Sequence, residues 1–218
     1  TAHLRAQILY YLAENLSART VEFTNNLQLL TGRADAQIEV EASIQRLFFY
    51  AAWSDKFDGS ARSVPLKAIA LVMNEAIGNC GVICDDRYPL LGFISAMAPL
   101  FATGNRSIII PSEPFSPIVT DFYQVLDTSD VPPGTVNILT GRHTDLALEL
   151  ASHMDIESVW SFSTSDVSRD IEKASVSNLK RTWVSNGEKR DWYNEESQGI
   201  QFLTNSIENK TIWIPYGE

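Results

Sequence analysis

Two groups of residues in this chain could do binding or acid–base chemistry: a charge cluster at positions 85–87 and a pair of histidines. Asp85, Asp86 and Arg87 follow an apolar segment, which places them at the end of a strand, where α/β proteins bind ligands. We expect a solvated, salt-bridged turn there, with a new ligand site as the alternative. His143 and His153 have the side chain most often used as a general acid or base. We interpret His143 as a turn residue.

The sequence lacks the short motifs of the common phosphate-binding and hydrolase sites. It holds no Gly-x-Gly-x-x-Gly, no Gly-x-x-x-x-Gly-Lys-Ser/Thr and no Gly-x-Ser-x-Gly, so neither phosphate-cradling loop nor a serine hydrolase is predicted. Cys80 and Cys84 are the only cysteines. A disulfide or half of a metal site is the alternative, but no histidine or acidic residue has the spacing of a metal motif. We predict two buried or half-buried free thiols, a reducing compartment and no metal site.

Composition excludes two classes of partner. The chain has 218 residues, 44% of them hydrophobic, and a net charge of -10, so it can bury a core but would repel a nucleic-acid backbone. The longest apolar run, 89–103, is shorter than the roughly 20 residues needed to cross a bilayer and contains Pro99. With no signal-peptide pattern, we expect a cytoplasmic protein that binds neither nucleic acid nor membrane.

The elements that would position these residues follow from hydrophobic spacing. An all-helical opening is expected over 1–60, with helices at 2–18, 20–31 and 36–58. From 68 to 184, β-rich segments alternate with helical ones, which indicates a Rossmann-like, doubly wound, mostly parallel sheet in a single α/β domain over 1–218. The expected strands are 68–74, 80–84, 107–111, 135–140, 158–162 and 179–184, and the expected helices are 90–103, 117–127, 144–153 and 165–175.

The end of the chain has a different character. Residues 186–209 form a polar connector, predicted as a loop with a possible short helix over 197–206. Residues 210–218 form a predicted tail strand with Trp213 on one face. Trp192 and Trp213 lie in these polar segments, so we interpret both as interface anchors.

Five motifs in order carry a resemblance to a known family. They are Arg5-Ala6-Gln7-Ile8-Leu9, Tyr50-Ala51-Ala52-Trp53-Ser54-Asp55-Lys56-Phe57-Asp58-Gly59, Gly104-Asn105 with Pro111-Ser112-Glu113, Pro132 to Gly141, and His153-Met154-Asp155-Ile156. The second is similar to the aromatic-Ala-x-Trp-x-Asp-Lys-x-x-Gly segment of the aldehyde dehydrogenase superfamily. The resemblance implies an NAD-binding-type fold and a packed, structural role for His153.

The departures from that family fall on its chemistry. Arg87 stands where the family has an Asn of the oxyanion hole, and Ile110 stands where it has a Lys that bonds the cofactor ribose. Ser163 replaces a Gly beside the cofactor phosphates, and Ser185 replaces the general base Glu. We therefore expect no catalytic residue in this chain. Its expected cofactor-binding set is empty, with weak relic positions at Glu113, Gly141 and Thr164.

Two further features narrow the resemblance to one branch of the family: the missing catalytic cysteine and the sequence at the end of the chain. The family needs a Cys thiolate in a separate catalytic domain, and neither Cys80 nor Cys84 stands near that position, so we expect the catalytic domain to be absent. Leu179-Lys180-Arg181-Thr182-Trp183 and the terminal Trp213-Ile214-Pro215-Tyr216-Gly217-Glu218 resemble the degenerate C-terminal domain of aldehyde dehydrogenase family 16. Thr1 at the start indicates a piece of a longer protein.

The resemblance implies a non-catalytic structural and assembly domain. Its parent would be a homodimeric, NAD-dependent aldehyde dehydrogenase that oxidises aldehydes to carboxylic acids in an upstream module, and this chain would bind no cofactor. The tail 210–218 would dock on the catalytic module of the same or a neighbouring chain. The alternative is a ligand-sensing module that uses the degenerate crevice at Arg87, Glu113, Thr164 and Ser185. An enzyme of unrelated chemistry is a third hypothesis.

Overall fold

A parallel sheet of five strands forms the centre of the protein. The computed structural model describes residues 1–217; Glu218, the last residue of the predicted tail strand, lies outside the described residues. The strands stand in the order β5-β4-β3-β6-β7, with all neighbours parallel. The chain thus moves outward from β3 to β5 and returns to the centre at β6, which confirms the predicted doubly wound α/β fold. The bounds are Asn79–Ile83 (β3), Arg106–Ile110 (β4), Val136–Ile138 (β5), Ser158–Ser161 (β6) and Arg181–Val184 (β7).

The helices follow the predicted order with two differences. Phe122 donates its N–H to Val119 rather than four residues back, which splits the predicted helix 117–127 into two. The helix predicted to reach residue 58 ends at Trp53, and a turn follows in which the N–H groups of Lys56 and Phe57 both donate to the Trp53 carbonyl oxygen. Gly59 then passes close to a strand: a Cβ there would lie 1.8 Å from the Val72 carbonyl oxygen. The helices are Ala2–Ala18 (α1), Thr20–Thr31 (α2), Ala36–Trp53 (α3), Pro89–Thr103 (α4), Pro117–Asp121 (α5), Tyr123–Asp127 (α6), His143–Ser152 (α7) and Ser165–Ser175 (α8).

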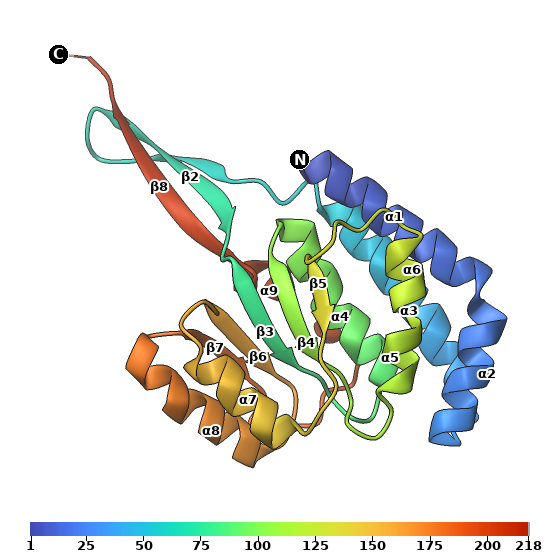
Figure 1. Cartoon of the computed structure of the whole chain (residues 1–218). Helices are drawn as coiled ribbons and strands as arrows, with labels where there is room; N and C mark the ends of the chain where they lie inside the picture. Colours follow the sequence, from blue (N-terminus) through green and yellow to red (C-terminus); the bar gives the residue numbers. More distant parts are fainter. Residues whose placement is uncertain (218) are drawn as a thin grey trace.

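Both faces of the parallel sheet are apolar, as predicted for buried parallel strands. Val82, Ile109 and Trp160 share a row across β3, β4 and β6 and pack in the core that includes α1, α3 and α4. Ile83 and Ile110 point to the opposite face, into a smaller cluster with α7 and α8. The helical opening therefore covers one face through α4, and α7 and α8 cover the other (Figure 1).

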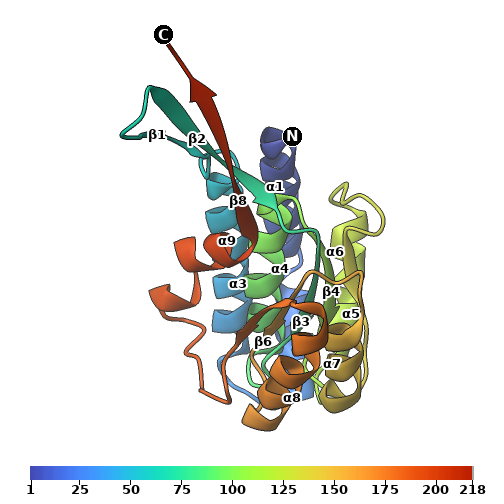
Figure 2. The same cartoon turned by 90° about the vertical axis from the view of Figure 1, so that its left-hand side faces the viewer.

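A second, antiparallel sheet projects from the body in both views (Figures 1 and 2). It consists of Ser60–Ser63 (β1), Ala68–Ala76 (β2) and Ile207–Pro215 (β8), in the order β1-β2-β8. The prediction that the strand starting at 68 belongs to the parallel sheet is wrong, because β2 pairs along its whole length with the tail strand. The predicted tail strand is confirmed and begins three residues earlier than 210, at Ile207.

The polar connector is more ordered than a loop. It contains the short helices Glu195–Ser197 (η2) and Ile200–Asn205 (α9), so the predicted helix in 197–206 is confirmed; a third short turn, Val176–Asn178 (η1), follows α8. The interpretation of Trp192 as an interface anchor is wrong: its side chain is fully buried against Phe162 and Phe202. In residues 1–217 no helix is long and apolar enough to cross a membrane.

Candidate functional site

Two adjoining cavities lie where β3, β6 and β7 end. This edge is the switch point of the sheet, because the chain leaves β3 and β6 in opposite directions, and α/β proteins bind ligands at such a point. The switch-point cavity, about 190 Å³, is lined by Asp85, Asp86, Arg87, Phe162, Ser163, Thr164, Gly187, Glu188 and Lys189. The connector cavity, about 450 Å³, is lined by Phe162, Trp183, Val184, Ser185, Glu188, Lys189, Arg190, Asp191, Asn194, Glu196 and Ser197.

The charge cluster after β3 forms a salt bridge and hydrogen bonds within the chain. Arg87 donates to both carboxylate oxygens of Asp85, at 3.2 and 2.6 Å, and to the Arg190 carbonyl oxygen at 3.1 Å. The hydrogen bond to Asp85 raises the pKa of Arg87 above its ordinary value. Asp85 is only 6% exposed and also accepts from Trp192 Nε1 at 3.1 Å. The predicted salt bridge is present, but its carboxylate is buried rather than solvated, and the guanidinium is committed within the chain.

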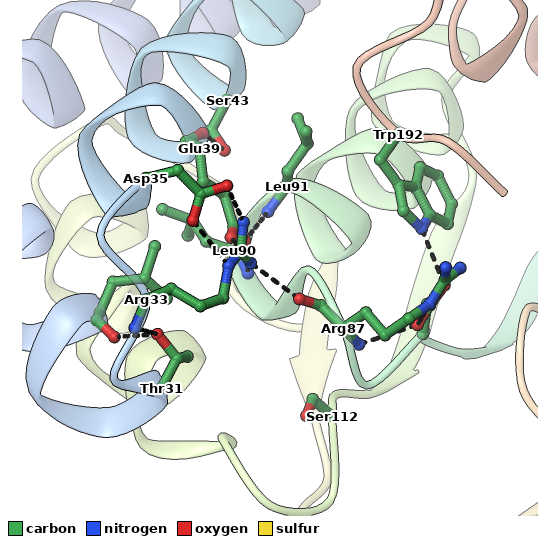
Figure 3. A network of polar contacts seen from close by, with 12 residues as sticks. Thr31, Arg33, Asp35, Glu39, Ser43, Arg87, Leu90, Leu91, Ser112 and Trp192 are labelled. Atoms are coloured by element: carbon green, nitrogen blue, oxygen red, sulfur yellow. Dashed lines mark hydrogen bonds and ion pairs between the residues drawn. The ribbon is translucent and has the colours of Figure 1, made fainter. Parts of the chain in front are cut away.

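A second network holds this turn against the helical opening (Figure 3). The buried carboxylate of Glu39 accepts from the N–H groups of Leu90 and Leu91, at 3.0 and 3.1 Å, and so caps the start of α4. Arg33 donates to Glu39 at 2.7 Å and to the Arg87 carbonyl oxygen at 2.8 Å. Burial raises the pKa of Glu39.

The relic position Glu113 is occupied by local contacts. Its N–H donates to Asp86 Oδ1 at 2.9 Å, and its carboxylate accepts from the N–H of His143, the first residue of α7. Glu113 therefore caps a helix. Gly141 stands just before that helix, where a Cβ would lie 2.8 Å from Leu146 Cδ1. Neither residue lines the two cavities.

The histidines differ from their predicted places. His143 is not a turn residue: it begins α7, is 3% exposed, and its ring contacts Ser163 Oγ at 3.1 Å and the Pro111 carbonyl oxygen at 2.8 Å. His153 is exposed rather than packed, and its Nδ1 accepts from the Asp155 N–H at 3.2 Å. The sequence carried no signal for the His143–Ser163 contact, because 20 residues and a strand separate the pair.

The other predicted positions are also tied to the fold. Ser185 continues the β6–β7 ladder through its N–H to Ser161, at 2.8 Å, and its hydroxyl donates to the Ser163 carbonyl oxygen at 3.3 Å. Ile110 is fully buried. Thr164, the third relic position, caps α8 by accepting from the Val167 N–H at 3.4 Å. Arg87, Ser163 and Thr164 share one cavity; Ser185 lies in the neighbouring one.

One wall of the connector cavity is an arginine surrounded by rings. The guanidinium carbon of Arg190 lies 5.5 Å from the ring centres of Phe162 and Phe202 and 5.7 Å from those of Trp183 and Trp192. Burial lowers the pKa of Arg190, and the four rings offset part of that cost because their faces attract cations. Arg190 also donates to the Glu196 carbonyl oxygen at 3.1 Å. The group fastens the connector to the sheet.

The cysteines are inert thiols. Cys80 and Cys84 are free and buried, as predicted, and burial raises the pKa of Cys80 to about 12. Both stay protonated near neutral pH, so neither suits a nucleophile. Within residues 1–217 no cluster of three His, Cys, Asp or Glu side chains could hold a metal ion.

A doubly wound sheet with helical cover on both faces defines the class as a dinucleotide-binding-type α/β fold. A profile of the aldehyde dehydrogenase family matches residues 1–193. The chain belongs to the aldehyde dehydrogenase family. NAD is the cofactor expected for that family, and the fold of residues 79–184 is its NAD-binding type.

Similar proteins cover most of this chain. Omega-crystallin of Enteroctopus dofleini is 31% identical over 83% of it, and an aldehyde dehydrogenase-like protein of Schizosaccharomyces pombe is 30% identical over 97%. The crystal structure of PnpE from Pseudomonas sp. WBC-3 is 26% identical and superimposes on 84% of the chain with a TM-score of 0.81. PnpE has also been solved in complex with nicotinamide adenine dinucleotide. The chain spans 37–39% of the length of these relatives.

Proposed function

We propose that this chain is a non-catalytic aldehyde dehydrogenase domain that serves assembly, of the type found at the C-terminus of aldehyde dehydrogenase family 16. Three of the four positions where the family pattern is broken are used for contacts inside the chain: Arg87 bonds Asp85, Ile110 is buried, and Ser185 bonds Ser163. The relic residue Glu113 caps α7. These contacts support a domain whose cofactor crevice has become structural.

The projecting sheet is the observation that best supports a role in assembly. Strand β8 pairs with β2 along one edge only, and its other edge is open within the described chain. Unpaired strand edges readily add a strand from another chain. Ile212, Trp213 and Ile214 are 37%, 54% and 46% exposed, so apolar side chains are exposed on both faces of this arm.

The parent protein would supply the chemistry. In the proposal it is a cytoplasmic, homodimeric enzyme that oxidises an aldehyde to a carboxylic acid with NAD in an upstream module. The tail 210–218 docks on that catalytic module in the same or a neighbouring chain. The chain itself binds no cofactor and oxidises no aldehyde.

The test is made on the parent protein by removing the tail. Deletion of 210–218 should lower its mass in light scattering and its aldehyde-dependent NADH production together. A milder variant, Trp213→Ser with Ile214→Ser, should weaken assembly without loss of folding. Val21→Ser with Leu29→Ser is the matched control, since these side chains on α2 are 75% and 85% exposed. Unchanged mass and activity after the deletion would refute the proposal.

Ligand sensing is the alternative function. The switch-point cavity stands at the edge where α/β proteins bind ligands, which favours it, but the Arg87 guanidinium is already paired. Thermal unfolding of the chain with a panel of small metabolites separates the two ideas. If a compound stabilises the wild-type chain but not Arg87→Gln, the ligand-sensing function is favoured. If no compound stabilises the chain, the ligand-sensing function is rejected.

A further inference from the structure

A serine and a histidine meet at the switch-point cavity with the geometry of a nucleophile and its base. Ser163 Oγ lies 3.1 Å from His143 Nδ1, within the range expected of such pairs. Ser163 lines the cavity, and His143 lies behind it with only 3% of its surface exposed. Of the two side chains, the Ser163 hydroxyl is therefore the one that faces solvent, and a substrate would approach it from that side.

The hydrogen bonds fix which ring nitrogen carries the proton. The Pro111 carbonyl oxygen can only accept, so His143 Nε2, 2.8 Å away, must donate to it. A neutral imidazole then has its lone pair on Nδ1, and this nitrogen accepts from the Ser163 hydroxyl. Pro111 therefore orients the ring in the tautomer that can take a proton from Ser163.

Two carboxylates would stabilise the charge that forms. Asp86 Oδ1 lies 4.0 Å from Nε2 and Glu113 Oε1 lies 4.0 Å from Nδ1 of His143. Both carboxylates are held in place: Asp86 accepts from the Glu113 N–H at 2.9 Å, and the Glu113 carboxylate accepts from the His143 N–H. A nearby carboxylate stabilises an imidazolium without itself becoming protonated.

Helix α8 begins two residues after the serine, and the positive end of its dipole favours a developing oxyanion nearby. The first N–H groups of a helix have no acceptor within it, and in α8 the Thr164 hydroxyl takes that of Val167. Ser165 and Asp166, which carry the next free N–H groups, do not line the cavity themselves. Gly187 does line it and packs against this helix start, since a Cβ there would lie 2.9 Å from the Ser165 nitrogen.

We propose that Ser163 and His143 form a catalytic pair that hydrolyses small carboxylic esters. Ser163 Oγ bonds to the ester carbonyl carbon while its proton passes to Nδ1 of His143. The carbon–oxygen bond to the alcohol then breaks, and Nδ1 returns the proton to the leaving alkoxide. Water repeats the two steps on the acyl-serine and releases the acid. The domain is proposed to be non-catalytic in aldehyde oxidation, and ester hydrolysis at Ser163 would be a different reaction, independent of the assembly role.

The experiment uses the whole chain with a fluorophosphonate probe and p-nitrophenyl acetate. Mass spectrometry should place the phosphonate on Ser163, and ester turnover should exceed that of Ser163→Ala by about 100-fold or more. Ser177→Ala is the matched control, because that serine is exposed on η1, which follows the C-terminal end of α8, whereas Ser163 precedes its N-terminal end. It should keep full turnover.

A second variant separates catalysis from folding. His143→Ala should lose turnover by about 100-fold and regain part of it when free imidazole is added, whereas Ser163→Ala should gain nothing from imidazole. Circular dichroism checks that each variant is folded. A phosphonate absent from Ser163, or equal ester turnover in wild type and Ser163→Ala, overturns the proposal.

Discussion

Two buried carboxylates, Asp85 and Glu39, organise the edge of the sheet where its strands end. Asp85 and Glu39 are 6% and 0% exposed, and each bonds an arginine and at least one further donor. Charge at such depth costs free energy unless it is fully hydrogen-bonded. Because the partners come from helix α3, the turn after β3 and the connector, these two side chains join segments far apart in the sequence.

The pH dependence of Glu39 gives the first prediction. Burial raises its pKa above 4.5, the ordinary value, so the neutral form is favoured on folding. Its contribution to stability is complete below about pH 4.5 and is lost as pH rises through the raised pKa. Glu39→Gln, which stays neutral, should therefore gain stability relative to wild type as pH rises. Urea midpoints of both proteins between about pH 4.5 and 8 measure this; a gap that is constant or moves the other way contradicts it.

For single residues, the sequence indicated which residue types were unusual but not which side chains or backbone groups they contact. The proposed departures at Arg87, Ile110, Ser163 and Ser185 were inferred from a family pattern that says which residue type belongs at each position. Their present contacts depend on strand order, which brings Ser163 beside His143 and Ser185 beside Ser163. No local spacing encodes such pairings.

At the scale of elements, the connector is the least predictable part and one of the best anchored. Its polarity indicates a loop, yet two arginines hold it. Arg190 lies among four rings, and buried Arg46 donates to the carbonyl oxygens of Trp192, at 2.8 Å, and Ser197. A few large buried side chains, such as Phe202, outweigh many exposed polar ones in deciding where such a segment lies.

Arg46→Met should loosen this attachment. The substitution leaves two buried carbonyl groups without a donor, which costs about 1–3 kcal/mol each. It also removes a cation that is desolvated, as its pKa near 10 reflects. We expect a net loss of about 1–3 kcal/mol in urea unfolding, with earlier proteolysis in 186–199. Arg169→Met is the control, because Arg169 is 67% exposed and should change stability by under about 0.5 kcal/mol. Equal stability of the two variants contradicts the proposed clamp.

Two glycines should respond to alanine with opposite sign. At Gly59 the new Cβ would meet the Val72 carbonyl oxygen at 1.8 Å, so the chain must shift where the projecting sheet begins. We expect Gly59→Ala to cost about 1–3 kcal/mol. Gly92 lies inside α4, with the nearest atom at 3.7 Å, so Gly92→Ala should add about 0.5–1 kcal/mol by helix propensity. Thermal unfolding of both variants measures the sign of each stability change. Lower stability of Gly92→Ala would show that Trp192 leaves no room for a Cβ at this position.

At the scale of the whole molecule, the parallel core was predictable and the projecting sheet was not. Alternation of β-rich and helical segments gave the strands and helices of 79–184, because each βαβ unit is local in the chain. The antiparallel sheet pairs 68–76 with 207–215, and only a long-range match decides that pairing. The prediction failed there because β2 precedes β3 directly and its apolar residues fit either sheet.

Hydrogen exchange should distinguish the parallel core from the projecting antiparallel sheet. Strand β6 is buried at every residue, whereas all of β1 and all of β8 after Ile207 are exposed, so the arm has little apolar contact to protect it. Amides exchange through local opening, and regions with few buried contacts open at lower free energy. We expect amides of β1 and β8 to exchange at least about 100-fold faster than those of β3 and β6 in the isolated chain, as read by mass spectrometry. In the parent assembly β8 should slow while β3 stays unchanged, because docking protects only the arm. Slow exchange of β8 in the isolated chain would mean that the arm is stable without a partner, and its open edge would then lose its value as an argument for assembly.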